Sequence, residues 1–267
     1  MSKTASTPLI PSTGLPVSEA LRQLLVLLLV GSGLLVASVA QATPETRVFI
    51  KVTQPGDAPN SSSGTLNKVY FNDGDSFTVL DGPLKGTKTR LAGFNTLESF
   101  GPAHKWGGWD AHELYVVAKQ ATLNARKGTW HCTTDGNRDG YGRMLMTCQD
   151  LIDDDIRKGL AHAYSVNDKP ASDHELALQK LAQGEKRGMW AKGIPPFILT
   201  STHSGDEGAG ADNYNRLIST EDGHTEKWKH QDVYKDCDWI CHPGGACMLH
   251  VFFKNRFGQT QAECLKH

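Results

Sequence analysis

The sequence has no excess of positive charge. Its 28 Lys and Arg residues are balanced by 29 Asp and Glu residues, which gives a formal net charge of −1. Proteins that bind nucleic acid without sequence preference gain affinity by neutralising phosphates and usually carry a basic surface. Diffuse electrostatic binding to a polyanion is therefore excluded, and any such binding has to be local to a site.

The N-terminal region lacks cysteine and carries only a short apolar run. No cysteine precedes Cys132, which excludes a lipid-modified cysteine at a cleavage site. The run over residues 24–40 is somewhat short for a membrane-spanning helix, follows Arg22, and leads into a small-x-small pattern that ends at Ala42. This pattern predicts a signal peptide over residues 1–42 and a secreted or periplasmic protein. If the segment is not cleaved, it would instead anchor the chain to a membrane.

Cysteines occur only in the remaining part, and there are six of them. In an exported protein disulfides are the default. Cys132 and Cys148 are equidistant from Gly140, in a turn-rich stretch, so a hairpin centred there would place them opposite each other and predicts a bond between them. Three pairings stay open for the other four cysteines, Cys237, Cys241, Cys247 and Cys264. A zinc site formed by these cysteines with nearby histidines is the less favoured alternative.

Composition divides the chain into five parts. After the signal peptide, residues 43–64 are rich in Pro, Ser and Gly and read as a linker. Residues 65–192 form the main domain, residues 193–226 a second linker rich in Ser, Gly and acidic residues, and residues 227–267 a disulfide-rich C-terminal appendage. No internal repeat is apparent.

Alternating short runs and turn residues predict a mainly β domain with some helix. Five strands are expected, at residues 69–71, 76–80, 87–92, 129–133 and 144–149. Helices are expected from an Asp110 cap to Gly128, over residues 151–160, and from a Ser172 cap to Arg187. Five strands with a helix between the third and fourth is the pattern of the five-stranded OB-fold barrel.

The chemistry of the chain is concentrated between residues 72 and 98. This stretch brings the oxygen-bearing side chains of Asp75, Asn95 and Glu98 together with the guanidinium of Arg90. Such a set can hold a hard cation beside a phosphate. With the later motif Asp139-Gly-Tyr-Gly-Arg143, it resembles the staphylococcal (micrococcal) nuclease family, whose sequences typically read D-G-D-T, then R-L-x-x-x-D-x-P-E, then D-x-Y-G-R. The resemblance covers residues 66–192.

The resemblance implies a calcium site. The family's ligands, two aspartates and a main-chain carbonyl, correspond here to Asp75, Asn95 and Thr96. Hard oxygen ligands suit Ca²⁺, or less favourably Mg²⁺ or another divalent ion, whereas Zn²⁺ would prefer imidazole or thiolate. Asn95 replaces the second aspartate and removes one negative charge, so we expect weaker calcium affinity or an altered metal preference.

The resemblance also assigns catalytic roles. Arg90 and Arg143 would clamp the phosphate, because planar guanidinium groups meet phosphoryl oxygens bidentately. Glu98 would activate or orient the attacking water. Leu97 stands where the family usually has proline before this glutamate, and Gly140 stands where a basic residue usually precedes Tyr141.

Two tyrosines, Tyr141 and Tyr164, are expected to bind a base or the terminal phosphate of the substrate. The sequence as a whole then predicts an exported calcium-dependent endonuclease that cleaves DNA and RNA without sugar specificity and leaves 3′-phosphates. DNA and RNA are the expected partners, and no stable protein partner is implied. The alternatives are a catalytically inactive OB-fold that binds nucleic acid or protein, and a site based on histidines such as His104 and His162, which carry no recognised motif. A third alternative is that the C-terminal appendage is the working part, an adhesive or inhibitory module carried on a nuclease body.

Overall fold

The computed structural model describes residues 48–53, 65–207 and 213–266. The predicted signal peptide lies outside the described residues, as does most of the predicted first linker. The described residues all belong to one compact unit. Along the described chain, no helix has the length and apolar character needed to cross a membrane.

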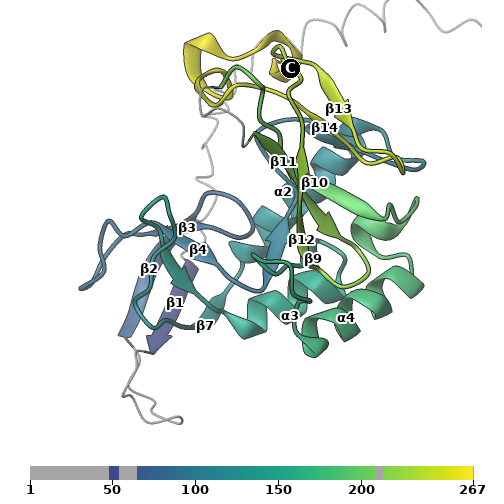
Figure 1. The fold of residues 1–267 in the computed structure, drawn as a ribbon. Helices are drawn as coiled ribbons and strands as arrows, with labels where there is room; N and C mark the ends of the chain where they lie inside the picture. Colours follow the sequence, from purple (N-terminus) through teal and green to yellow (C-terminus); the bar gives the residue numbers. More distant parts are fainter. Residues whose placement is uncertain (1–47, 54–64, 208–212, 267) are drawn as a thin grey trace, which may run out of the picture. The chain divides into compact units, whose positions relative to one another are not determined.

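A four-stranded sheet carries the N-terminal strands in the order β3-β2-β1-β7 (Figure 1). Its strands are β1 (Val48–Thr53), β2 (Thr65–Phe71), β3 (Phe77–Val79) and β7 (Thr129–Thr133). β1 is parallel to β7 and antiparallel to β2. β1 lies inside this sheet, between β2 and β7. The prediction of a linker over residues 43–64 is therefore wrong for residues 48–53, which form a strand.

A parallel pair, β4 (Thr89–Leu91) and β8 (Met144–Met146), lies next to this sheet. Single bridges connect the two, Thr78 with Lys88 on one side and Thr133 with Thr147 on the other. The apolar core between them includes Phe71, Phe77, Leu91, Met146 and Ile152. Within the described residues the strands do not form a closed barrel, so the expected mixture of strands and helices is confirmed but a five-stranded OB barrel is not.

The three expected helices are present. They are α2 (Ala111–Ala125), α3 (Gln149–Arg157) and α4 (Asp173–Gly184). Asp110 caps α2 in a capping box with Glu113, and the Ser172 side chain caps α4 by accepting from the backbone N–H of Glu175. Short 3₁₀ turns occur at Gly188–Trp190, Phe253–Asn255, Gly258–Thr260 and Glu263–Leu265.

In the C-terminal third the longest regular elements after α4 are β-strands. β10 (Phe197–Ser201), β11 (Tyr214–Ser219) and β12 (Thr225–Lys229) form an antiparallel sheet (Figure 1). Gln179 on α4 donates to the Thr220 carbonyl, just after β11. The segment expected to be a second linker, residues 193–226, therefore contains β10, β11 and the start of β12, and that expectation is corrected. Alternate buried residues such as Asn215 and Leu217 hold β11 against the protein.

The cysteine-rich end is not a separate appendage. β13 (Trp239–Cys241) and β14 (Cys247–Leu249) form a sheet with β6 (His104–Lys105), which belongs to the main domain. A further antiparallel pair joins β5 (Phe94–Thr96) to β9 (Ala161–Ala163). One apolar core contains residues of both regions, among them Trp106, Leu114, Trp190, Ile198, Leu217 and Met248. The boundary expected at residue 227 thus does not separate two cores.

All six cysteines form disulfides. The expected Cys132–Cys148 bond is confirmed. Of the three open arrangements for the other cysteines, the chain has Cys237–Cys264 with Cys241–Cys247, which removes the zinc alternative. Three disulfides indicate folding in an oxidising extracellular or periplasmic environment.

Candidate active site

A cavity of about 640 Å³ collects most of the residues expected to be functional. The expected site residues that line it are Arg90, Asn95, Glu98, Tyr141, Arg143 and Tyr164. Asp75 and Thr96 are not part of its wall; both are buried and contact the lining residues from behind. Strands β4 and β5, the turn before β8 and the segment after β9 therefore converge on one concave surface.

The tight turn at residues 72–75 positions Asp75. A Cβ atom on Gly74 would lie 2.5 Å from Thr96 Cγ2, so only glycine lets the turn approach β5 this closely. Asp75 Oδ2 accepts hydrogen bonds from the Thr96 backbone N–H at 2.9 Å and from its hydroxyl at 3.2 Å. The Asp75 carbonyl accepts from the Leu91 N–H at 2.9 Å. The carboxylate is thus fixed between β4 and β5.

Arg90 occupies the space between the predicted metal ligands. Its guanidinium forms an ion pair with Asp75, and its Nη2 donates to Asn95 Oδ1 at 2.5 Å. Burial by itself would lower the pKa of Arg90, but the charges of Asp75 and Asp73 outweigh it and raise that pKa. The two side-chain oxygens expected to bind calcium therefore do converge on one positive charge, and in this structure that charge belongs to Arg90.

The third expected ligand is also engaged. Asn95 Nδ2 donates to the Thr96 carbonyl at 2.8 Å and lies 3.3 Å from His162 Nε2. Among the described residues, no group of three or more His, Cys, Asp or Glu side chains is arranged to hold a metal ion. The donor set Asp75, Asn95 and Thr96 fits a hard cation only if the Arg90 guanidinium moves away from the two side-chain oxygens.

Glu98 is held by its backbone and by its neighbour. Its N–H donates to His104 Nε2 at 3.2 Å, and the side chain of Leu97 is buried in the apolar core. Burial lowers the pKa of His104 to about 3, so this imidazole is neutral and can accept the hydrogen bond. Leu97 thus anchors the segment by packing, where the resembling family uses the rigidity of proline.

The carboxyl group of Glu98 is partly withdrawn from water. Burial raises its pKa, and the charges of Arg256, Arg90 and Arg143 lower it by less. A carboxylate whose pKa is raised is, when ionised, a stronger base than an ordinary glutamate. Glu98 therefore has the electrostatic setting of a general base.

Arg143 is positioned by the carboxylate of Asp139. Asp139 Oδ2 accepts from Arg143 Nε and Nη2, both at 2.7 Å, while its Oδ1 accepts from the backbone N–H groups of Tyr141 and Arg143. Gly142 has φ of 80°, which makes the turn possible. Tyr141 is 82% exposed, and its ring centroid lies 5.6 Å from Arg143 Cζ. The turn thus presents an aromatic face and a guanidinium side by side.

Tyr164 and His162 lie on the β9 side of the cavity. The ring centroid of Tyr164 is 5.9 Å from Arg90 Cζ. His162 is buried, and burial lowers its pKa to about 4. Its Nδ1 contacts the Ala163 carbonyl at 3.1 Å, which leaves Nε2 to accept from Asn95. His162 therefore orients Asn95 as a neutral group.

Several residues of the site were not anticipated. Asp73 is next to the site, and burial followed by the charge of Asp75 raises its pKa to about 7. Thr200 and Arg216 line the cavity from strands in the segment expected to be a linker. Arg256 acts on Glu98 through its charge. Only Asp73 had a sequence signal, because it belongs to the same Asn-Asp-Gly-Asp turn as Asp75; the three others depend on long-range folding.

The comparisons with known proteins add no relatives: neither a scan against family models nor a search of curated proteins finds a match for this chain. Any assignment therefore rests on the residues of the cavity and their geometry. A half-buried carboxyl group, three arginines and two tyrosine rings around a cavity of about 640 Å³ can bind a phosphate and remove a proton from a water molecule beside it.

Proposed function

We propose that this protein is an exported, calcium-dependent endonuclease that hydrolyses phosphodiester bonds of both DNA and RNA and leaves 3′-phosphates. The observation that carries the proposal is that Glu98, Arg90 and Arg143 line one cavity. These are the three residues to which the motif resemblance assigns catalytic roles. Arg143 comes from a segment beyond α2 and β7, so its convergence with Arg90 and Glu98 is not a consequence of sequence proximity.

The chemistry follows from the charges. Water attacks phosphorus in line, a bond forms between the water oxygen and phosphorus, and the bond to the 5′ oxygen breaks. Glu98 takes one proton of the attacking water, and the departing 5′ oxygen takes a proton from the surrounding water and leaves as a hydroxyl group. Arg90 and Arg143 bind the phosphoryl oxygens, on which negative charge increases in the transition state.

For Arg90 this requires a change of partner. Its guanidinium now pairs with Asp75 and Asn95. A phosphate in the cavity offers a bidentate alternative of the same charge as the carboxylate. When Arg90 turns to the phosphate, the oxygens of Asp75 and Asn95 and the Thr96 carbonyl become the donors that would hold Ca²⁺. Bound there, the ion would supply further positive charge beside the phosphate.

Fold and compartment support the proposal at a coarser level. Strands β1 to β4, β7 and β8 surround one apolar core, with single bridges between the sheet and the parallel pair. We infer a distorted OB-type barrel from this arrangement. The disulfides are consistent with secretion into the medium or the periplasm, where DNA and RNA would be met as substrates.

The second candidate is a nucleic-acid-binding module that does not cut. One observation favours it: Arg90 fills the space between Asp75 and Asn95, where the calcium of an active site would be held. If the guanidinium never leaves, Arg90 does not contribute and the cavity binds a phosphate through its other residues, such as Arg143 and the tyrosines. Cleavage distinguishes the two candidates directly.

The test is digestion of single-stranded DNA and of RNA by the purified protein, first with calcium and then with a chelator. Products are labelled to identify their ends. We expect cutting of both polymers with calcium, none with chelator, and 3′-phosphate ends. Products with 5′-phosphates, or equal cutting in chelator, would contradict the mechanism, and binding without cutting would favour the module.

A further inference from the structure

The cavity has a second wall that the motif residues do not provide. Thr200 on β10 and Arg216 on β11 line it, together with the turn that carries Tyr141 and Arg143. Both belong to the sheet β10-β11-β12, in the C-terminal third of the chain. The cavity therefore has three arginines in its wall: Arg90, Arg143 and Arg216.

Arg216 is presented by a rigid strand. Its neighbours on β11, Asn215 and Leu217, are buried on the other face, so the half-buried Arg216 side chain points away from the core. In the register of the sheet, Arg216 on β11 lies directly across from Lys227 on β12, so a second cation lies next to it on the neighbouring strand.

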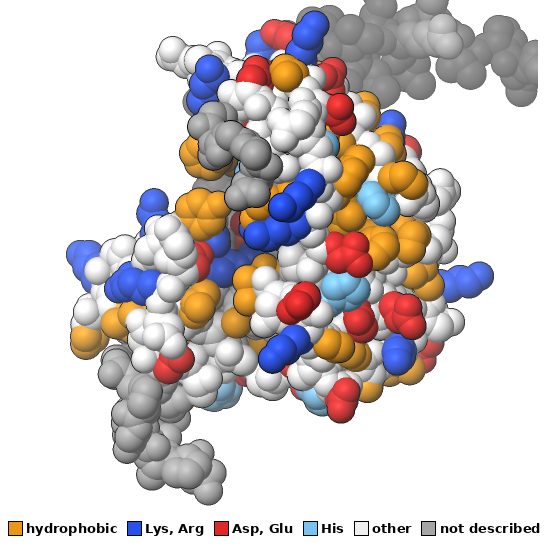
Figure 2. All heavy atoms as spheres, viewed as in Figure 1, with side chains coloured by type: hydrophobic (Ala, Val, Ile, Leu, Met, Phe, Trp, Pro, Cys, Tyr) orange, Lys and Arg blue, Asp and Glu red, His pale blue; other side chains and the backbone are white. Residues whose placement is uncertain are grey.

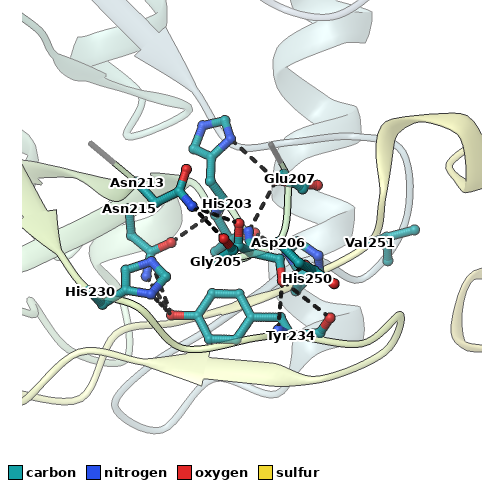
Figure 3. A network of polar contacts seen from close by, with 12 residues as sticks. His203, Gly205, Asp206, Glu207, Asn213, Asn215, His230, Tyr234, His250 and Val251 are labelled. Carbon is teal, nitrogen blue, oxygen red and sulfur yellow. Dashed lines mark hydrogen bonds and ion pairs between the residues drawn. The ribbon is translucent and has the colours of Figure 1, made fainter. Parts of the chain in front are cut away.

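A polar network fixes the start of this strand (Figure 3). Asn215 Oδ1 accepts from the His203 N–H at 3.0 Å, and Asn215 Nδ2 donates to the Tyr234 hydroxyl at 2.9 Å. The Tyr234 N–H in turn donates to Ser204 Oγ at 2.8 Å. Buried hydrogen bonds of this kind hold a strand in one position, so Arg216 faces the cavity as part of the fold.

A second, more open cavity of about 420 Å³ adjoins the first and is also lined by cations. It shares Tyr141 and Arg143 with the first cavity, and the cations it adds are Lys85, Lys88 and Arg138. In Figure 2, Lys and Arg side chains gather where the surface is hollowed beside the β10-β11-β12 sheet. The two cavities, which share Arg143, are thus lined together by Arg90, Arg138, Arg143 and Arg216, in a protein whose net charge is −1.

We propose that Arg216 binds a phosphate that flanks the scissile one, so that the C-terminal sheet forms part of the site for a single-stranded polynucleotide. This inference rests on the proposed function for the nature of the ligand. A dinucleotide with one phosphodiester would occupy the space between Arg90 and Arg143 and leave Arg216 without a phosphate. A longer strand would reach Arg216, with its bases against exposed rings such as Tyr141.

The test measures binding separately from cutting. Fluorescently labelled thymidine oligonucleotides of two and eight nucleotides are titrated with wild-type protein in chelator, and with Arg216→Gln, Arg216→Lys and Arg157→Gln. Arg157 is exposed on α3 and outside both cavities, so its variant is the matched control for loss of one charge. Thermal unfolding of each variant shows whether it is folded.

We expect Arg216→Gln to weaken binding of the eight-nucleotide strand about tenfold, as for loss of one charge-assisted hydrogen bond. The slope of log affinity against log salt should fall by about 0.7, the value for one phosphate on a single strand. Binding of the dinucleotide and the behaviour of Arg157→Gln should not change. Arg216→Lys should keep the salt slope.

The inference is wrong if both lengths lose affinity equally, if the eight-nucleotide strand loses none, or if the wild type does not bind it. Cleavage kinetics provide the second readout: Arg216→Gln should raise KM for the longer strand and leave kcat unchanged. If Arg216→Gln weakens binding of the longer strand only, and the wild type does not cut, the proposed nuclease function is refuted and the inference about Arg216 is supported. If the wild type cuts and neither binding nor cutting changes in Arg216→Gln, the inference about Arg216 is refuted and the proposed nuclease function is not.

Discussion

Asp155 gives the protein a stability that depends on pH. The residue lies on α3 and is fully buried. Its Oδ1 accepts from Asn124 Nδ2 on α2 at 2.8 Å, and its Oδ2 has no hydrogen-bond partner among the described residues. Burial, reinforced by the charge of Asp154, raises the pKa of Asp155 to about 8. The folded protein therefore holds this carboxyl group protonated at neutral pH.

Proton linkage determines whether this carboxyl group stabilises the protein at low or at high pH. In the unfolded chain the carboxyl group has its ordinary pKa of 3.8 and releases its proton first. A raised folded-state pKa gives stability that is complete below pH 3.8 and is lost as pH rises toward 8. Each pH unit in this window costs about 1.4 kcal/mol, so the loss between pH 5 and pH 8 is at most about 4 kcal/mol.

The assay compares wild type with Asp155→Asn, which has nearly the same shape and no titration. The free energy of unfolding is measured by urea denaturation at several values between pH 5 and pH 8. Other titrating groups are common to both proteins, so the difference between the two curves isolates Asp155. We expect the free energy of unfolding of the variant to increase steadily relative to that of the wild type as pH rises. A difference that stays constant across the range would refute the reasoning.

Three further predictions concern the disulfide, the helix cap and the calcium ligands. Replacing both Cys132 and Cys148 by alanine opens a loop with a sequence separation of 16 and should cost about 3 kcal/mol in unfolding free energy; a urea midpoint unchanged from wild type would contradict this. Asp110→Ala removes the α2 capping box and should cost about 1 kcal/mol, measured the same way, and no loss would mean that the cap is not needed. Asn95→Asp restores a carboxylate beside Asp75 and should lower the calcium concentration for half-maximal cutting several-fold, as read from a calcium titration. An unchanged calcium requirement would show that Asn95 is not a ligand.

The sequence predicts local structure well where the signals are local. The Asp110 and Ser172 caps mark the starts of α2 and α4, and the turn-rich stretch around Gly140 brings Cys132 to Cys148. Each of these depends on residues close in the chain. The same holds for Asp75, which a four-residue turn delivers to β5.

Long-range pairing could not be predicted in this way. β1 pairs in parallel with β7, about 80 residues later, and its segment is flanked by prolines that suggest a linker. Arg216 lies beyond a stretch rich in Ser, Gly and acidic residues, and only the pairing of β11 with β10 brings it to the cavity. The Arg90 contacts with Asp75 and Asn95 likewise depend on how β4 and β5 meet the turn, which no local pattern encodes.

The most direct test of the central claim compares Glu98→Gln with wild type in calcium, using single-stranded DNA as substrate. Glu185→Gln, at an exposed position after α4 and outside the cavity, serves as the matched control. Loss of a general base should slow cutting by at least about 100-fold, while the control cuts like the wild type. If Glu98→Gln cuts at the wild-type rate, Glu98 is not the base and the proposed mechanism is wrong.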